Sequence, residues 1–375
     1  MNRYFATVGR GLESFAAQEL EQLGAQKVTI GFCGVEFEGD LGLLYRVNLW
    51  SRICFRVLWT LGEFPCESSE DLYRGIQAMD WEYWLPLDRT FAVDATGKTP
   101  QLNHSHFTAL QVKNALVDWQ RQQWGDRGTV DTENPQVRLN VHLHQNHCTV
   151  SLDSSGSSLH RRGYRPAVGV APLKETLAAA LIQESGWQGT EAFFDPLCGS
   201  GTLPLEAALV GLRIAPGSFR PGFGFETWPN FDGALWEEIV AQASAGERES
   251  LPQGVGGSDG DPQQIELALT NAQRSGLSRQ VQFSCRDLRQ VQAPCDRGIV
   301  MCNPPYGHRL GDRQQLGAFY QQLGQVLKTE FKGWKAYVLS GNRELSQRIG
   351  LRSSRRISVL NGTIPCQFLE YELFR

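Results

Sequence analysis

The pattern of hydrophobic and polar positions divides the chain into a front part and a back part. Over residues 3–37 it predicts a strand, a helix and two alternating strands, which form a small β-α-β-β unit. A second α/β unit follows and ends near Asp153. Residues 153–158 are small and polar, so we expect a flexible linker or the exit of an edge strand there. The main predicted elements of the front part are a strand at 4–7, a helix at 12–23, strands within 28–37, a helix at 108–124 and a strand at 137–144.

In the back part, from about residue 190, strands alternate with helices, as in a parallel sheet that helices cover on both faces. Asp261 and Pro262 supply the N-cap and the first turn of one helix. The final strands lie on both sides of Asn361-Gly362, which predicts an antiparallel pair joined by a turn. The predicted elements are strands at 191–194, 254–258, 281–284, 297–301 and 335–339, with helices at 202–210 and 262–275. The fold class is therefore α/β, with two smaller α/β units before the main sheet.

Composition and charge narrow the possible functions. The 375 residues are 41% hydrophobic and 20% charged, as in a globular protein, and their formal charge of −4 argues against binding nucleic acid by bulk charge. The nine cysteines contain no C-x-x-C pair, so we expect a reducing cytoplasm and no metal site. No apolar run has the length of a signal peptide or a membrane span, and we expect neither secretion nor membrane insertion. Nothing in the sequence demands more than a monomer.

A glycine-rich turn is the first candidate for chemistry. Residues 195–202, DPLCGSGT, follow a predicted strand and open a predicted helix, where two glycines let backbone amides approach a ligand closely. The alternative is a simple tight turn. The next strand ends at Asp259, the position at which an acid usually binds ribose hydroxyls. The two features together favour a nucleotide-like cofactor.

Two further strand ends carry polar motifs. Asp287 follows the third strand and is placed either to accept a hydrogen bond from an adenine amino group or to cap a helix. The fourth strand runs into Asn303-Pro304-Pro305-Tyr306, where two prolines fix the backbone and leave their carbonyl oxygens without a ladder partner. This is the most specific motif of the chain.

Taken in order, DPLCGSGT, GSDGD and NPPY resemble the motifs of class I S-adenosylmethionine (SAM) methyltransferases that methylate an exocyclic amino group. The segments 159–165 (LHRRGYR) and 171–178 (APLKETLA) resemble those of the THUMP-domain RNA guanine-N2 methyltransferases. The resemblance extends over essentially the whole chain. It implies a Rossmann-like catalytic domain, with a mostly parallel seven-stranded sheet and a C-terminal antiparallel hairpin, after ferredoxin-like and THUMP domains. We expect these three domains at residues 1–50, 51–155 and 156–375.

The resemblance also assigns roles to residues. SAM would be the cofactor, with its methionine end against Asp195, its ribose on Asp259 and its adenine near Asp287. The expected cofactor-binding set is Asp195, Pro196, Cys198, Gly199, Ser200, Gly201, Thr202, Asp259, Asp287 and Asn303. The expected catalytic set, which forms the pocket for the target base, is Asn303, Pro304, Pro305 and Tyr306. Cys198 has no evident base nearby in the sequence, so we interpret it as a small turn residue rather than a nucleophile.

These residue types suit transfer to a guanine N2 amine, a poor nucleophile. The side-chain oxygen of Asn303 and the carbonyl of Pro304 can each accept one N–H bond, which aims the nitrogen lone pair at the methyl group without a strong base. Tyr306 is expected to stack on the base. Because the base must leave any helix to reach such a pocket, the target is flipped out or single-stranded.

Two basic clusters, at 160–165 and 343–356, are interpreted as RNA contacts rather than solvated charged faces. The expected RNA-binding residues are Arg161, Arg162, Tyr164, Arg165 and Lys174. An aromatic insertion at 214–246 is expected to pack beside the active site. The favoured substrate is 23S rRNA and the alternative is tRNA. Less favoured alternatives are a DNA or protein amino-group methyltransferase and a non-catalytic RNA-binding assembly factor.

Overall fold

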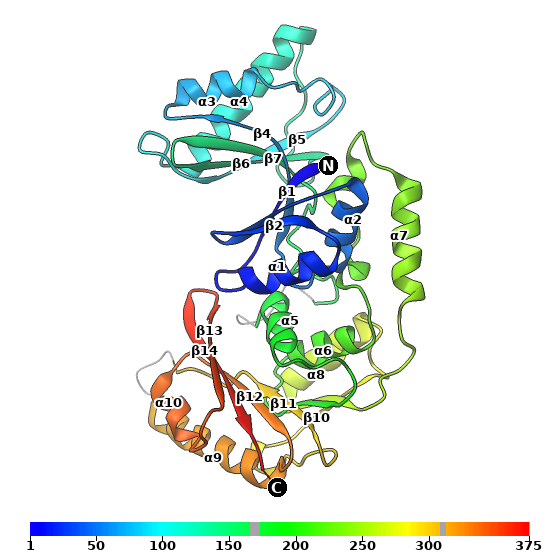
Figure 1. Ribbon diagram of the computed structural model, residues 1–375, viewed down its shortest axis with the longest axis vertical. Helices are drawn as coiled ribbons and strands as arrows, with labels where there is room; N and C mark the ends of the chain where they lie inside the picture. Colours follow the sequence, from blue (N-terminus) through cyan, green and yellow to red (C-terminus); the bar gives the residue numbers. More distant parts are fainter. Residues whose placement is uncertain (166–172, 308–312, 375) are drawn as a thin grey trace.

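The computed structural model describes residues 1–165, 173–307 and 313–374, and in these ranges the strands form two seven-stranded sheets. In Figure 1 the N-terminal sheet forms the upper part of the molecule and the C-terminal sheet the lower part. The nine cysteines are all free thiols. None of the helices in the described ranges combines the length and apolarity needed to cross a membrane.

The N-terminal sheet has the order β2-β3-β1-β4-β7-β6-β5. Its elements are β1 (Asn2–Thr7), α1 (Glu13–Gln22), β2 (Gln26–Gly31), β3 (Gly34–Gly39), α2 (Leu41–Trp50), β4 (Arg56–Pro65), α3 (Ser69–Gln77), β5 (Phe91–Gly97), α4 (Ser105–Trp124), β6 (Val137–His144) and β7 (His147–Asp153). Strand β4 is ten residues long, pairs with β1 near its start and with β7 along its length, and changes register between Thr60 and Gly62. The two α/β units that the sequence predicts are therefore joined in one continuous sheet.

The C-terminal sheet has the order β10-β9-β8-β11-β12-β14-β13. Its strands are β8 (Ala192–Asp195), β9 (Val255–Asp259), β10 (Val281–Cys285), β11 (Gly298–Cys302), β12 (Lys335–Ser340), β13 (Arg355–Asn361) and β14 (Ile364–Glu372). The helices around it are α5 (Glu175–Glu184), α6 (Thr202–Gly211), α7 (Gly233–Ala245), α8 (Pro262–Arg274), α9 (Arg313–Glu330) and α10 (Arg343–Arg348), with short 3₁₀ turns at η1 (Pro216–Phe219), η2 (Gly224–Thr227) and η3 (Leu288–Gln290). Strands β8 to β12 are parallel, and β14 is antiparallel to β12 and β13. The predicted fold class is confirmed, and Asp261 caps α8 as expected.

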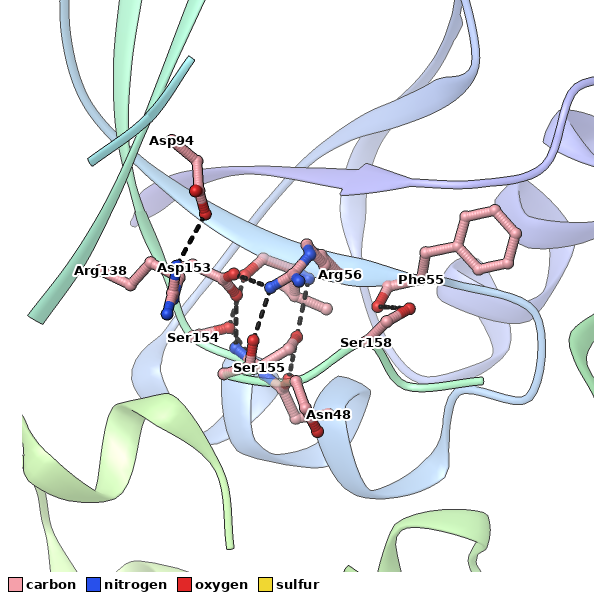
Figure 2. A network of polar contacts seen from close by, with 12 residues as sticks. Asn48, Phe55, Arg56, Asp94, Arg138, Asp153, Ser154, Ser155 and Ser158 are labelled. Atoms are coloured by element: carbon pink, nitrogen blue, oxygen red, sulfur yellow. Dashed lines mark hydrogen bonds and ion pairs between the residues drawn. The ribbon is translucent and has the colours of Figure 1, made fainter. Parts of the chain in front are cut away.

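Of the two expectations for 153–158, the flexible linker is wrong; the segment is the exit of β7, but that strand lies inside the sheet, between β4 and β6, and not at its edge. Asp153, Ser154 and Ser155 are almost fully buried and lie between β4 and α2. Figure 2 shows the polar contacts: Asp153 forms an ion pair with Arg56, and the Ser155 hydroxyl donates to Asn48 Oδ1 at 2.6 Å. Small side chains are needed here because they fit between packed elements and supply hydroxyl groups that pair buried polar atoms.

The aromatic insertion at 214–246 was expected to pack beside the active site. It packs on α2 instead, away from the strand ends that carry the catalytic motifs. The Phe225 ring stacks on Tyr45 of α2 with the centroids 4.4 Å apart, and Trp236 of α7 meets Tyr45 edge-on. Figure 1 shows α7 running alongside α2. The insertion therefore holds the front and back parts of the chain together, because its aromatic side chains pack on α2 and, through Trp228, on Trp59 of β4.

Candidate active site

Three of the predicted motifs meet at the carboxyl edge of the C-terminal sheet. Strand β8 lies between β9 and β11, so Asp195, Asp259 and the Asn303 motif follow adjacent parallel strands at one edge. Ligands of open α/β sheets bind at this edge. The topology therefore places the predicted cofactor residues beside the predicted base pocket.

Hydrogen bonds fix the glycine-rich turn between β8 and α6. The Cys198 N–H donates to the carbonyl of Ser258 at 2.9 Å, and the Gly199 N–H donates to a carboxylate oxygen of Asp259 at the same distance. The other Asp259 oxygen accepts from the Asp261 N–H at 3.0 Å. Asp259 therefore connects the turn to the end of β9, a contact that the sequence motif alone did not reveal.

The two glycines of the turn have different neighbours. Gly201 has a φ of +85°, and an added Cβ would lie 2.7 Å from the Phe283 ring. Gly199 has a φ of +50°, but its Cβ position is open, with only a Gln264 oxygen at 3.7 Å. The turn is therefore closed on the protein side at Gly201 and accessible at Gly199, which fits a cofactor that approaches the backbone closely.

Asp195 is the buried acid of this site, with its carboxylate accepting from the Leu197 N–H at 2.9 Å. Burial raises the pKa of Asp195 well above its usual range, and the nearby Asp259 carboxylate raises it further. The raised pKa favours the neutral carboxyl group, and a bound cation such as the ammonium of a methionine moiety would stabilise its ionised form.

The predicted adenine residue, Asp287, has a different partner. Its carboxylate accepts from Arg289 through two side-chain nitrogens, at 2.9 and 3.0 Å, and caps η3 through the Arg289 N–H. The hydrogen bonds from Arg289 lower the pKa of Asp287 to about 2. The helix-cap alternative weighed for this residue is therefore observed, and a contact with adenine stays a prediction.

The Asn303 motif contains a compact set of side chains. The Tyr306 hydroxyl donates to Asn303 Oδ1 and lies 3.3 Å from the Asn361 amide nitrogen, which donates to it. The ring of Tyr306 is 9% exposed and packs against Gly341, where an added Cβ would approach it to 2.9 Å. Its packing suits a role in positioning Asn303, and the expected stacking on a target base stays a prediction.

The prolines of the motif differ in exposure. Pro304 is buried, whereas Pro305 is exposed and its carbonyl accepts a hydrogen bond from the Tyr320 hydroxyl at 3.2 Å. That bond connects the motif to α9. The contacts of the motif with Tyr320 and with Asn361 could not be foreseen from the motif, because both residues are distant from it in the sequence.

The first basic cluster is largely internal, which differs from the expected RNA contacts. Arg162 and Tyr164 are 2% and 1% exposed, and both side chains bind the buried carboxylate of Glu206 in α6. A phosphate contact needs an accessible cation, and of the five expected residues only Arg161 and Lys174 have exposed side chains. Ala171 and Pro172 of the neighbouring motif lie outside the described residues.

Arg165 is half-buried and connects two elements of the site. It forms an ion pair with Glu175 at 3.0 Å and donates to the hydroxyls of Ser200 and Thr202. It therefore binds hydroxyl groups of the glycine-rich turn, whereas Asp259 binds a backbone N–H of the same turn. A basic residue in a charged run gives no sequence signal for this role, since its partners follow about 10 to 37 positions later.

The second basic cluster has accessible side chains. Its five arginines, Arg343, Arg348, Arg352, Arg355 and Arg356, are all exposed, and Arg355 forms an ion pair with Glu184. They belong to α10, β13 and the loop between them. This cluster is therefore the stronger candidate for a basic surface.

Three family models match the chain. An RMKL-like methyltransferase domain matches residues 162–370, a THUMP domain matches 66–153, and an RlmL ferredoxin-like domain matches 3–58. The first of these models alone extends over more than half of the chain.

Similar proteins agree with these matches. A Synechocystis protein named as an RNA methyltransferase is 53% identical over 371 residues, which cover 99% of this chain and 97% of that protein. The ribosomal RNA large subunit methyltransferase K/L of Syntrophotalea carbinolica is 40% identical over 99% of this chain but only 53% of its own length. The chain therefore spans about half the length of that relative.

One similar protein of known structure is described as a methyltransferase and was solved in complex with S-adenosylhomocysteine (SAH), the form of SAM that has lost its methyl group. Its sequence is 30% identical, and it superposes with a TM-score of 0.91 over 100% of this chain and 98% of that one. The glycine-rich turn, the buried acid and the strand order have already indicated where such a cofactor fits. The chain thus belongs to the RMKL-like methyltransferase family, as a SAM-dependent methyltransferase whose catalytic domain follows RlmL ferredoxin-like and THUMP domains.

Proposed function

We propose that this enzyme transfers a methyl group from SAM to the exocyclic N2 amine of a guanosine in 23S rRNA. The observation that carries the proposal is the adjacency of β8 and β11, which brings the cofactor turn and Asn303 to one edge of the sheet. When bound, SAM supplies an electrophilic methyl group. The chain supplies the binding site, the orientation and the hydrogen-bond acceptors.

On the cofactor side, Asp195 would bind the methionine ammonium and Asp259 the ribose hydroxyls. Asp259 already accepts from two backbone N–H groups, and a carboxylate has about four lone-pair sites, so ribose contacts need not displace these bonds. The open side of Gly199 leaves room for the ligand. Cys198 is 6% exposed and burial raises the pKa of its thiol, which supports a packing role and not a nucleophilic one.

On the substrate side, Asn303 and the Pro304 carbonyl would accept the two N–H bonds of the target amine. The Asn303 oxygen has two lone pairs, and Tyr306 uses one of them. The second lone pair can then accept from the target amine, and its direction is fixed because Tyr306 restricts the rotation of the Asn303 side chain. Orientation of the amine lone pair toward the methyl group makes a strong base unnecessary before transfer, and the cationic nitrogen formed by transfer then loses one N–H proton to water.

RNA as the substrate rests on the THUMP match and on the names of the relatives. The K/L relative favours large-subunit ribosomal RNA, which would place the enzyme in the cytoplasm; tRNA is the alternative. We further propose that the exposed arginines of α10 and β13 contact RNA phosphates and that the protein acts as a monomer.

The test is tritiated-methyl transfer from SAM to four separated acceptors: unmodified 23S rRNA transcript, unmodified tRNA, genomic DNA and total protein. The labelled product is digested and its nucleosides are identified by mass spectrometry. We expect N2-methylguanosine from 23S rRNA. Label found only in tRNA would show that tRNA, and not 23S rRNA, is the substrate. Label in DNA or protein, or no label in any acceptor, would contradict the proposed function.

A further inference from the structure

The turn of the β13–β14 hairpin brings an amide side chain to the catalytic motif. Asn361 is the last residue of β13 and pairs with Ile364, the first residue of β14. Its amide nitrogen donates to the Tyr306 hydroxyl at 3.3 Å. Ile364 and the Tyr306 ring also pack at one place, since an added Cβ on Gly341 would lie 3.0 Å from the first and 2.9 Å from the second. The hairpin turn is therefore packed against the motif, and the cofactor and base-binding roles assigned above do not include Asn361.

The hydrogen bonds at the Tyr306 hydroxyl run in one direction. A phenol has a single proton to donate, and the nitrogen of an amide donates but does not accept. Because the Asn361 nitrogen donates to the Tyr306 oxygen, the Tyr306 proton is directed elsewhere, and Asn303 Oδ1 accepts it. The thiol of Cys366 also interacts with this hydroxyl, but sulfur is a weak acceptor and competes little with a carbonyl oxygen. Asn361, Tyr306 and Asn303 therefore form a donor-to-acceptor chain that ends at the Asn303 oxygen.

The direction of this chain decides which end of the Asn303 amide is held. When an asparagine side chain flips about its last bond, the oxygen and the nitrogen exchange places, and an acceptor becomes a donor. A hydroxyl by itself does not select between the two orientations, because it can donate to the oxygen or accept from the nitrogen. Tyr306 is only 9% exposed, so water has little access to its proton, and a buried donor without an acceptor is costly. The bond from Asn361 therefore favours the orientation in which Asn303 presents its oxygen.

We propose that Asn361 is a positioning residue for methyl transfer: it directs the Tyr306 hydroxyl to the Asn303 oxygen and so keeps that oxygen toward the target amine. This role rests on the proposed function and deepens it. The amine carries N–H groups, so a flipped Asn303 would meet it with a second donor instead of an acceptor. Strand β13 also carries Arg355 and Arg356, both exposed, so one strand would contact RNA phosphates and orient the acceptor of the target amine.

The test is a double-mutant cycle in the full chain between Asn361 and the hydroxyl of Tyr306. Asn361→Ala and Asn361→Asp are each made alone and together with Tyr306→Phe, which removes the hydroxyl and keeps the ring. Gln367→Ala is the matched control, because this amide lies in the same hairpin and donates to Ser358 at 2.8 Å instead of to the motif. Single-turnover methyl transfer is measured at saturating SAM and saturating unmodified 23S rRNA transcript, with binding of each ligand and melting temperature measured separately.

Asn361→Ala should slow transfer about fivefold, the effect of one net hydrogen bond, while SAM and RNA affinity stay near those of the wild type. Asn361→Asp should slow it further, by on the order of tenfold, because its carboxylate accepts the Tyr306 proton and takes it away from Asn303. In the Tyr306→Phe background neither change should slow transfer by more than about twofold, because no hydroxyl is left to direct. The Gln367→Ala control should transfer at the wild-type rate.

Two results would overturn the positioning role. If the wild type methylates the transcript but the Asn361 variants are as fast as the Gln367→Ala control, the role is wrong and the proposed function stands. The same conclusion follows if they lose as much in the Tyr306→Phe background as alone, because Asn361 would then act on the hairpin and not through the hydroxyl. A wild type that binds SAM but makes no N2-methylguanosine in the transcript would instead contradict the proposed function itself, and the positioning role with it.

Discussion

Asn303 is held by a short chain of side chains rather than by a charged partner. Tyr306 donates to its oxygen and Asn361 donates to Tyr306, so residues from the loop after β11 and from the end of β13 restrict one another. An amide held in this way has a fixed acceptor direction and does not change protonation near neutral pH. The proposed chemistry therefore depends on the orientation of the Asn303 side chain and not on its charge.

Replacing Asn303 by Ala should reduce methyl transfer by on the order of 10²-fold, because a mispositioned amine loses its near-attack geometry. SAM should still bind to this variant. Tyr306→Phe, which keeps the ring against Gly341, should have a smaller effect of about tenfold on transfer. Single-turnover transfer and calorimetric SAM binding are the measurements, and wild-type transfer by Asn303→Ala would remove this residue from the mechanism.

Asp195 predicts a pH dependence with a definite sign. Because burial raises the pKa of this group in the folded protein, the folded state holds its proton above the unfolded-state pKa. The stability of the free protein should fall as pH rises through that window. A cationic ligand needs the ionised carboxylate, so SAM affinity should rise with pH over the same range and binding should release a proton.

Proton release is measured by calorimetry of SAM binding in two buffers of different ionisation enthalpy. Asp195→Asn is the control and should bind SAM weakly without release. Identical heats in both buffers for the wild type, and an affinity that does not vary with pH, would refute the ammonium-binding role.

The turn between β8 and α6 depends on backbone conformations that only glycine adopts at low cost. Gly201→Ala should lower the free energy of unfolding by more than the roughly 1–2 kcal/mol of the left-handed backbone, because its Cβ also meets the Phe283 ring at 2.7 Å. SAM affinity should fall at least tenfold as the turn moves. Gly276→Ala is the matched control, with φ +69° and open space around its Cβ.

Chemical denaturation and SAM titration of both variants test this prediction. Gly276→Ala should show the backbone cost alone and retain SAM binding. Equal losses of stability in the two variants, with SAM affinity retained in Gly201→Ala, would show that the turn tolerates a side chain.

Strands β8, β11 and β12 could be predicted well because parallel strands buried on both faces appear as short apolar runs. The 153–158 segment and the aromatic insertion could not, because small and aromatic residues reveal their neighbours only after folding. At the site, the motifs placed Asp195, Asp259 and Asn303 correctly at one sheet edge. The partners of Tyr306, Asp287 and Arg162 depend on tertiary contacts and have no local pattern.

At the scale of the whole molecule, buried polar contacts join the ferredoxin-like and catalytic domains. Arg162 donates to the carbonyls of Ser51 and Arg52 and pairs with Glu206 of α6. Arg52 donates in return to the carbonyl of Ile214 at 2.8 Å. Each of these two arginines therefore has hydrogen-bond partners in the other domain, and separating the domains would remove those partners.

Arg162→Met should destabilise the protein by about 3–5 kcal/mol, because it leaves the Glu206 carboxylate buried without its cation. The double variant Arg162→Met/Glu206→Gln should recover part of this loss, since the amide is neutral and still accepts from Tyr164. Urea unfolding of the single and double variants gives the comparison. A double variant no more stable than the single one would show that the lost carbonyl contacts, and not the unpaired charge, set the cost.

The proposed reaction is the formation of N2-methylguanosine in 23S rRNA, with Asn303 as an acceptor for the target amine. The most direct measurement is mass spectrometry of nucleosides from the 23S rRNA of a strain that lacks the gene, complemented with the wild type or with Asn303→Ala at equal protein levels. N2-methylguanosine should be reduced in the deletion strain, return with the wild type and stay reduced with the variant. An unchanged amount in the deletion strain, or full recovery with Asn303→Ala, would contradict the account.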